Sequence, residues 1–208
     1  MVKVKICGIT NLEDALAAAD LGADMLGFNF YEGSKRYVEP AVAAKIINGL
    51  DGRVDPVGVF VNADIDTIQR TVEATGLAAV QLHGDERPEF VHEVARTCGM
   101  PVIKALRVSP GFLVEVIREF SADSILLDVF SPAAFGGTGE RFDWRVAVAA
   151  KEHTDRLFLA GGLTPDNVAE AVELVRPYAV DVASGVEAGP RKKDAIKIQA
   201  FIRNAKGI

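Results

Sequence analysis

The sequence has few residues of the kinds that build disulfides, metal sites or membrane spans. Its 208 residues include two cysteines, Cys7 and Cys98, and three histidines. Two cysteines do not suggest a disulfide framework, and the histidines lack metal-site spacing. No apolar run approaches the length of a membrane span, and no signal-peptide core follows the N-terminal lysines. We therefore expect a cytoplasmic protein that holds no metal and contacts no membrane.

An excess of basic charge and the common nucleotide motifs are also missing. Lys and Arg total 23 against 29 Asp and Glu, for a net charge of −6. A nucleic-acid partner usually requires a basic face, so we expect none. The first apolar run is not followed by Gly-x-Gly-x-x-Gly, and no Gly-Lys-Ser/Thr phosphate loop is present. The sequence thus argues against nucleotide triphosphates as ligands.

Short Val/Ile/Leu-rich runs alternate with helix-period segments along the whole chain. Such near-continuous apolar runs are typical of parallel strands that are buried on both faces. We predict strands at 2–7, 25–30, 56–61, 79–82, 102–106, 125–127, 157–160 and 179–182. We predict helices near 11–21, 39–49, 65–75, 87–97, 111–120, 143–152, 166–175 and 194–205.

Eight strand–helix units are the number needed to close a (β/α)₈ TIM barrel, an α/β fold. We expect one catalytic domain over residues 1–208, with short loops, because such barrels usually have about 250 residues. An open doubly wound sheet is the alternative. Two motifs predict helix starts: a capping box at Thr10-x-x-Glu13, and Thr164 followed by Pro165 at the first helical position.

In a barrel, the functional groups lie where strands end, and two of these ends carry reactive side chains. Cys7 ends the first predicted strand and is either a buried small hydrophobe or a catalytic thiol. Asp128 follows the sixth strand. A partly desolvated carboxylic acid that stays protonated near neutrality can act as a general acid, whereas a loop aspartate more simply caps a turn.

Glycine-bearing segments follow the last three strands, and their backbone N–H groups could approach an anion. The alternative is that they are flexible turns. The loops after strands seven and eight of such barrels frequently form a phosphate site, so we expect a phosphorylated substrate. The candidate phosphate-binding residues are Gly137, Thr138, Gly161, Gly162, Ser184 and Gly185.

Three further polar residues lie at or near strand ends. Arg36 could clamp a substrate carboxylate or belong to a solvated basic surface. His83 could bind substrate or satisfy a hydrogen bond at the rim, and Asp181 must find a partner if it is buried. A base, an acid, a carboxylate clamp and a phosphate cradle together suit proton transfer on a phosphosugar, as in isomerisation, epimerisation or a lyase step.

Nine motifs, in order from the first strand to the last, give the chain a close resemblance to the phosphoribosylanthranilate isomerase family of tryptophan biosynthesis. Ala183 stands where a second serine is common in that family. The motifs are VKICGIT (4–10), GFNFYEGSKRY (27–37), VGVFVN (57–62), QLHG (81–84), LLD (126–128), GGTG (136–139), FDW (142–144), GGL (161–163) and DVASGVE (181–187).

The resemblance implies a barrel without a cofactor that rearranges N-(5-phosphoribosyl)anthranilate to 1-(2-carboxyphenylamino)-1-deoxyribulose 5-phosphate. It implies that Asp128 protonates the sugar ring oxygen, that Cys7 removes the C2 proton, and that Arg36 holds the anthranilate carboxylate. His83 and Asp181 are the remaining candidate substrate-binding residues. The protein is expected to be a monomer or a homodimer.

Three alternative functions remain open from the sequence. One is a catalytically silent barrel that only binds a phosphorylated ligand. Another is an indole-glycerol-phosphate synthase, which would be expected to need a lysine as general acid at a strand end, and Lys104 is the candidate to check. The third, a ribulose-phosphate epimerase, would be expected to need metal ligands, and no suitable His/Asp set is found in the sequence.

Overall fold

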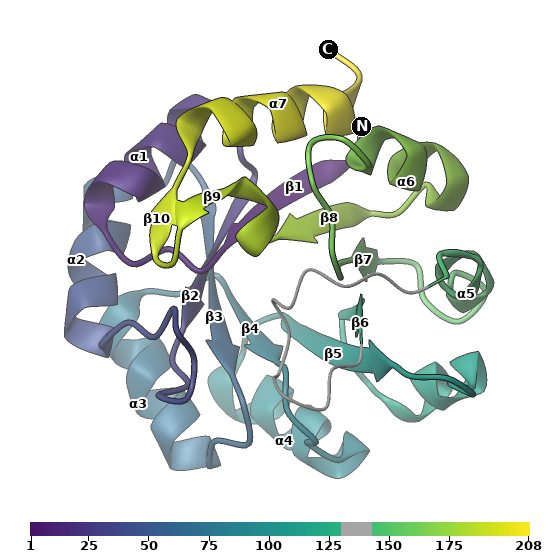
Figure 1. The fold of residues 1–208 in the computed structure, drawn as a ribbon. Helices are drawn as coiled ribbons and strands as arrows, with labels where there is room; N and C mark the ends of the chain where they lie inside the picture. Colours follow the sequence, from purple (N-terminus) through teal and green to yellow (C-terminus); the bar gives the residue numbers. More distant parts are fainter. Residues whose placement is uncertain (130–142) are drawn as a thin grey trace.

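The computed structural model describes residues 1–129 and 143–208, and in them eight parallel strands close into a barrel (Figure 1). The strands follow one another in chain order, and β1 pairs with both β2 and β8. The predicted barrel is confirmed, and the open sheet is wrong. The strands are β1 (Lys3–Cys7), β2 (Met25–Asn29), β3 (Asp55–Phe60), β4 (Ala79–Leu82), β5 (Val102–Val108), β6 (Ser124–Val129), β7 (Leu157–Leu159) and β8 (Ala179–Val182).

Helical segments surround the barrel, as Figure 1 shows. The fifth connection differs from the prediction, because it holds a short 3₁₀ helix, η1 (Val114–Glu119), in place of an α-helix over 111–120. Gly111, with φ of +84°, lies before this segment. The α-helices are α1 (Leu12–Asp20), α2 (Pro40–Leu50), α3 (Ile65–Thr75), α4 (Pro88–Cys98), α5 (Arg145–Ala150), α6 (Val168–Val175) and α7 (Ala195–Lys206).

A small insertion that the sequence pattern did not predict lies between β8 and α7. It consists of a 3₁₀ turn, η2 (Ser184–Val186), and an antiparallel hairpin of β9 (Glu187–Gly189) and β10 (Lys192–Lys193). In Figure 1 this hairpin lies beside α1 and the loop that joins the end of β1 to α1. A hydrogen bond from the hydroxyl of Thr10 to the carbonyl oxygen of Arg191 helps to hold the hairpin in this position.

Two predicted helix starts are wrong in detail. The N-cap of α1 is Asn11, whose side chain accepts from the N–H of Asp14, because the hydroxyl of Thr10 is engaged by the hairpin. Asn is as good an N-cap as Thr, so little is lost. The start of α6 is Val168, with Asn167 at the N-cap, and the residues after Thr164 form a turn.

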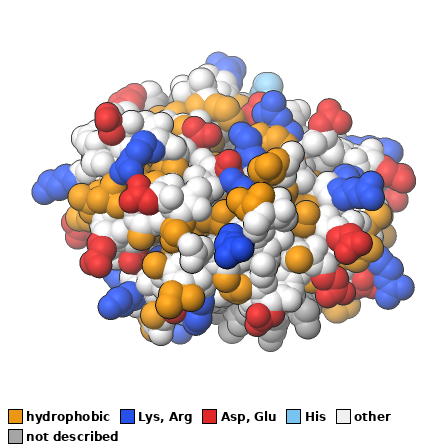
Figure 2. All heavy atoms as spheres, turned by 90° about the horizontal axis from the view of Figure 1, so that it is seen from above, with side chains coloured by type: hydrophobic (Ala, Val, Ile, Leu, Met, Phe, Trp, Pro, Cys, Tyr) orange, Lys and Arg blue, Asp and Glu red, His pale blue; other side chains and the backbone are white. Residues whose placement is uncertain are grey.

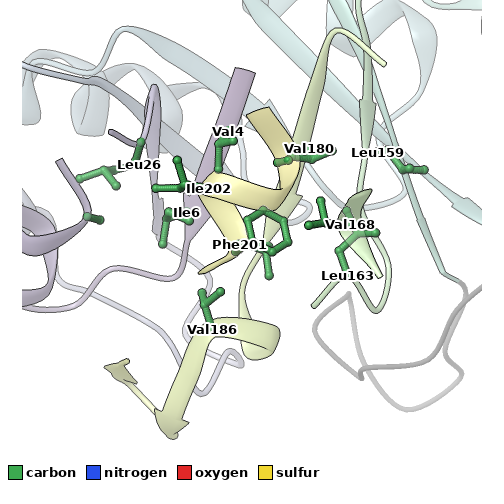
Figure 3. Close-up of a cluster of buried hydrophobic side chains, with 14 of the residues drawn as sticks. Val4, Ile6, Leu26, Leu159, Leu163, Val168, Val180, Val186, Phe201 and Ile202 are labelled. Carbon is green, nitrogen blue, oxygen red and sulfur yellow. The ribbon is translucent and has the colours of Figure 1, made fainter. Parts of the chain in front are cut away.

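Alternation along the strands decides which side chains face the barrel interior. One buried cluster draws on six strands and fills the interior: Met25, Val57, Ile103, Ala105, Leu126, Phe158, Ala160 and Ala179. Val4 and Ile6 of β1 belong to a second cluster, between the strands and the helices. Figure 3 shows Phe201 and Ile202 of α7 among the side chains of this outer cluster. Because neighbouring residues of a strand point to opposite faces, Lys5 and Cys7 face the interior.

The surface carries charges of both signs. Figure 2 shows Lys and Arg side chains interspersed with Asp and Glu over the face in view, so no large basic face appears there. No helix in the described part of the chain is long and apolar enough to cross a membrane.

Candidate active site

The thiol of Cys7 lies beside a buried ion pair at the end of β1. The ammonium of Lys5, two residues earlier on the same face, contacts Oδ1 of Asp181 at 2.9 Å. Gly27 of the neighbouring β2 makes room for both groups, because a Cβ there would lie 2.6 Å from the sulfur and 3.0 Å from Nζ of Lys5. Asp181, which needs a partner if it is buried, therefore has one in Lys5. The sequence pattern did not identify this partner.

Burial and charge act on this thiol in opposite directions. Burial raises the pKa of Cys7 above its ordinary value, and the carboxylate of Asp181 raises it further, while the ammonium groups of Lys5 and Lys193 lower it. Burial also lowers the pKa of Lys5, but the charges and hydrogen bonds of Asp181 and Cys7 together outweigh burial and leave the Lys5 pKa raised. Lys5 is therefore a permanent cation beside the sulfur at neutral pH.

The carboxyl group of Asp128 is buried at the end of β6, with 5% of the residue exposed. Its Oδ1 accepts from the N–H of Val129, and Oδ2 lies 3.3 Å from Nε2 of His83. The other ring nitrogen of His83 is 2.8 Å from the amide nitrogen of Gln81. Nε2 is buried and not aligned for a hydrogen bond with any described group. The structure thus brings His83 and Asp128 together. Nε2 of His83 and Oδ2 of Asp128 are available to hydrogen-bond a ligand.

Arg36 lies on the loop after β2 and forms a two-point ion pair with Glu187 of the hairpin. Its Nε and Nη2 donate to the two carboxylate oxygens at 2.7 and 2.8 Å. Lys193 donates to the same carboxylate at 3.1 Å and to the carbonyl of Ala183 at 3.0 Å. Two of the five N–H donors of the guanidinium are used in this way, so others remain for a bound carboxylate. The side chain is neither free nor part of a solvated basic surface.

The loops after β7 and β8 meet around a small hollow beside Asp128 and Asp181. Gly161 and Gly162 both have positive φ, of 82° and 66°. Among the described residues, none accepts a hydrogen bond from the N–H of either glycine. The hollow is lined by the predicted glycines and by Ser184 and Gly185. Gly185 approaches the other loop closely, because a Cβ there would overlap the carbonyl oxygen of Leu163.

The other two predicted phosphate-binding residues, Gly137 and Thr138, lie outside the described residues. In the described part of the chain, no group of three or more His, Cys, Asp or Glu side chains could hold a metal ion.

Lys104 is not at the barrel mouth. Its neighbours in sequence, Ile103 and Ala105, belong to the interior cluster, so Lys104 points to the outer face of β5. There its ammonium contacts Glu86 at 2.6 Å and the carbonyl of Gly84 at 2.8 Å. A lysine held in this way cannot serve as a general acid in the barrel interior, which removes the argument for a synthase.

Three charged residues of the site were not identified from the sequence: Lys5 and Lys193, which act on the thiol, and Glu187, which pairs with Arg36. For Lys5 the signal was present, because alternate residues of a strand share a face and Cys7 had already been placed at the mouth. For the other two there was no local signal, since the hairpin that carries them is not visible as a strand pattern.

The whole chain is similar to proteins of one family. A family model described as N-(5'-phosphoribosyl)anthranilate isomerase matches residues 4–204. N-(5'-phosphoribosyl)anthranilate isomerases from Citrifermentans bemidjiense and Geobacter sulfurreducens are each 53% identical, and the matches cover 98% and 100% of those proteins and the whole of this chain.

Solved structures of the same family share the fold. The phosphoribosyl anthranilate isomerase of Thermotoga maritima is 46% identical with a TM-score of 0.91, and both chains are covered completely. Another solved isomerase, in complex with reduced 1-(o-carboxyphenylamino)-1-deoxyribulose 5-phosphate, is 45% identical over the full length of both chains with a TM-score of 0.88. The chain therefore belongs to the phosphoribosylanthranilate isomerase family, enzymes of tryptophan biosynthesis.

Proposed function

We propose that Cys7 and Asp128 are the general base and the general acid of the family's Amadori rearrangement in this chain. Asp128 protonates the furanose oxygen of N-(5-phosphoribosyl)anthranilate as the ring opens to a Schiff base. The thiolate of Cys7 then takes the proton from the sugar C2, giving an enolamine that becomes the ketone. The observation that carries this proposal is the position of both groups at the carboxyl ends of β1 and β6, facing the barrel interior.

The order of the two steps follows from the chemistry of the sugar. The C2 proton becomes acidic only when the neighbouring carbon is an iminium, so the acid acts first and a modest base then suffices. A buried carboxyl group is suited to donate a proton, and His83 beside it can orient the carboxyl group or contact the sugar. We assign His83 and Asp181 as substrate-binding residues, because both are buried at the interior of the same site.

Arg36 would hold the anthranilate carboxylate through N–H groups that Glu187 does not use. The pairing with Glu187 supports this assignment, because it orients the guanidinium before the substrate arrives. The glycine-bearing loops after β7 and β8 would hold the phosphate, with Gly161, Gly162, Ser184 and Gly185 as donors, and Gly137 and Thr138 would contribute from the third segment.

The test uses purified protein with freshly prepared phosphoribosylanthranilate, without added metal or nucleotide, and follows the loss of substrate fluorescence. Cys7→Ser and Asp128→Asn should each lower kcat by on the order of 10²–10⁴-fold or more. Cys98→Ser, on α4, is the matched control and should turn over like the wild type. Turnover of either site variant within a few-fold of the wild type would refute the role of that residue.

We further infer a single catalytic domain, residence in the cytoplasm, and a monomer or a homodimer in solution. The assembly inference is supported by a 44% identical structure of Thermotoga maritima, described as monomers generated from a dimeric isomerase, which has a TM-score of 0.86. Light scattering of the purified protein over a range of concentrations tests the assembly, and a stable mass above the dimer would refute it.

A further inference from the structure

The role of Cys7 as a base depends on its thiolate, and burial works against that form. A thiol in an apolar interior holds its proton more tightly than in water. In the free protein, burial is the largest influence on Cys7 and raises its pKa. A nearby positive charge is therefore needed to favour the thiolate. The candidates are the charged residues around the sulfur.

Four charged side chains from four parts of the fold act on the sulfur. Lys5 comes from β1 itself, Asp181 from β8, Lys193 from β10 and Arg36 from the loop after β2. Two of the three cations, Lys193 and Arg36, are directed at the carboxylate of Glu187, which offsets their charge. Lys5 is paired as well, with Asp181, but it is completely buried, and of these three cations it is the one that interacts with the sulfur by both charge and hydrogen bonding.

We propose that Lys5 is a positioning residue that stabilises the thiolate of Cys7, and that Asp181 limits this effect while holding the ammonium in place. The geometry supports the proposal at Gly27, where the sulfur and Nζ of Lys5 both lie within 3.0 Å of the same missing Cβ. Oδ1 of Asp181 contacts Nζ at 2.9 Å and holds it in place. Lys5 keeps its proton throughout, while the thiolate takes the substrate's C2 proton and becomes a thiol.

The effect of Lys5 on turnover rests on the proposed function, but its effect on the thiol does not. The effect on the thiol is therefore tested first, without substrate. In a Cys98→Ala background, the rate of alkylation of Cys7 by iodoacetamide is measured as a function of pH, and its midpoint reports the pKa of the thiol. Removal of a cation at this distance should raise the midpoint in Lys5→Met by about one to two pH units. Asp181→Asn removes the opposing charge and should lower the midpoint by about one unit.

Opposite shifts distinguish an electrostatic role from a structural one. If Lys5 only stabilised the fold, both variants would break the same ion pair, and their midpoints would move together or stay unchanged, which would overturn the proposal. Lys3→Met is the matched control, because Lys3 lies on the same face of β1 with its ammonium over the ring of Tyr178. It should leave the midpoint where it is in the wild type.

Two further variants keep the test decisive if Lys5→Met does not fold. Lys5→Met combined with Asp181→Asn leaves no unpaired buried charge, and its midpoint should lie above that of Asp181→Asn alone. Lys5→Arg keeps the positive charge and should stay closer to the wild type. Equal midpoints for Asp181→Asn and the double variant would refute the proposal.

Kinetics then separate the inference from the proposed function. With Lys5→Met, kcat at neutral pH should fall about 10–100-fold, in proportion to the lost thiolate, and recover as the pH is raised. If the alkylation midpoints move as expected and the pH profile of kcat does not, Lys5 tunes the thiol but Cys7 is not the base. If the midpoints do not move, the inference fails whatever the role of Cys7.

Discussion

Replacing Lys104 by methionine should strongly lower the free energy of unfolding and leave kcat unchanged. The ammonium is almost completely buried and donates to Glu86 at 2.6 Å, to the carbonyl of Gly84 at 2.8 Å and to that of Leu82 at 3.4 Å. The variant leaves Glu86 as a buried carboxylate that retains only backbone donors, the N–H groups of Asn62 and Gly84. Breaking a buried ion pair in this way costs about 3–5 kcal/mol.

Urea unfolding followed by circular dichroism measures this cost. With a slope of about 3 kcal/mol per molar, the midpoint of Lys104→Met should fall by roughly 1–2 M. Adding Glu86→Gln should restore much of the loss, because replacing both partners of a buried pair is often close to neutral. The kcat of the folded variant should match that of the wild type. A loss below about 1 kcal/mol, or a double variant no more stable than the single one, would refute the reasoning.

Three other outcomes follow from the site geometry. Burial raises the pKa of Glu187, but the hydrogen bonds and charges of Arg36 and Lys193 together outweigh it and leave the pKa below the ordinary 4.5. The stabilisation is therefore present above pH 4.5 and lost as the pH falls through the lowered value, and Glu187→Gln should flatten the loss of melting temperature in this acid range. Gly185→Ala should raise the KM for substrate several-fold, because its Cβ would push against the carbonyl of Leu163; an unchanged KM would argue against a phosphate role for this loop. Gly27→Ala should slow both turnover and alkylation of the nearby thiol by at least tenfold, and normal rates would show that the sulfur does not need this space.

The positions of Cys7 and Asp128, the proposed base and acid, could be predicted from the sequence because both lie at the ends of buried strands. Cys7 and Asp128 end apolar runs, and in parallel strands of a barrel such ends meet at one rim. The close contact of His83 with Asp128 was not predicted, because it depends on how β5 sets the register between its two neighbours, β4 and β6.

The eight strands and most of the helices could be predicted from the amino-acid sequence alone, because buried parallel strands and amphipathic helices have characteristic hydrophobic patterns. The tertiary structure alone decided which charges meet. Lys5 and Asp181 are 176 positions apart, and Arg36 and Glu187 are 151 apart. They come together only because β8 closes the barrel against β1 and the hairpin lies beside the loop between β1 and α1. Charge partners at such separations carry no periodic signal, because their pairing depends on barrel closure and strand register rather than on neighbouring residues.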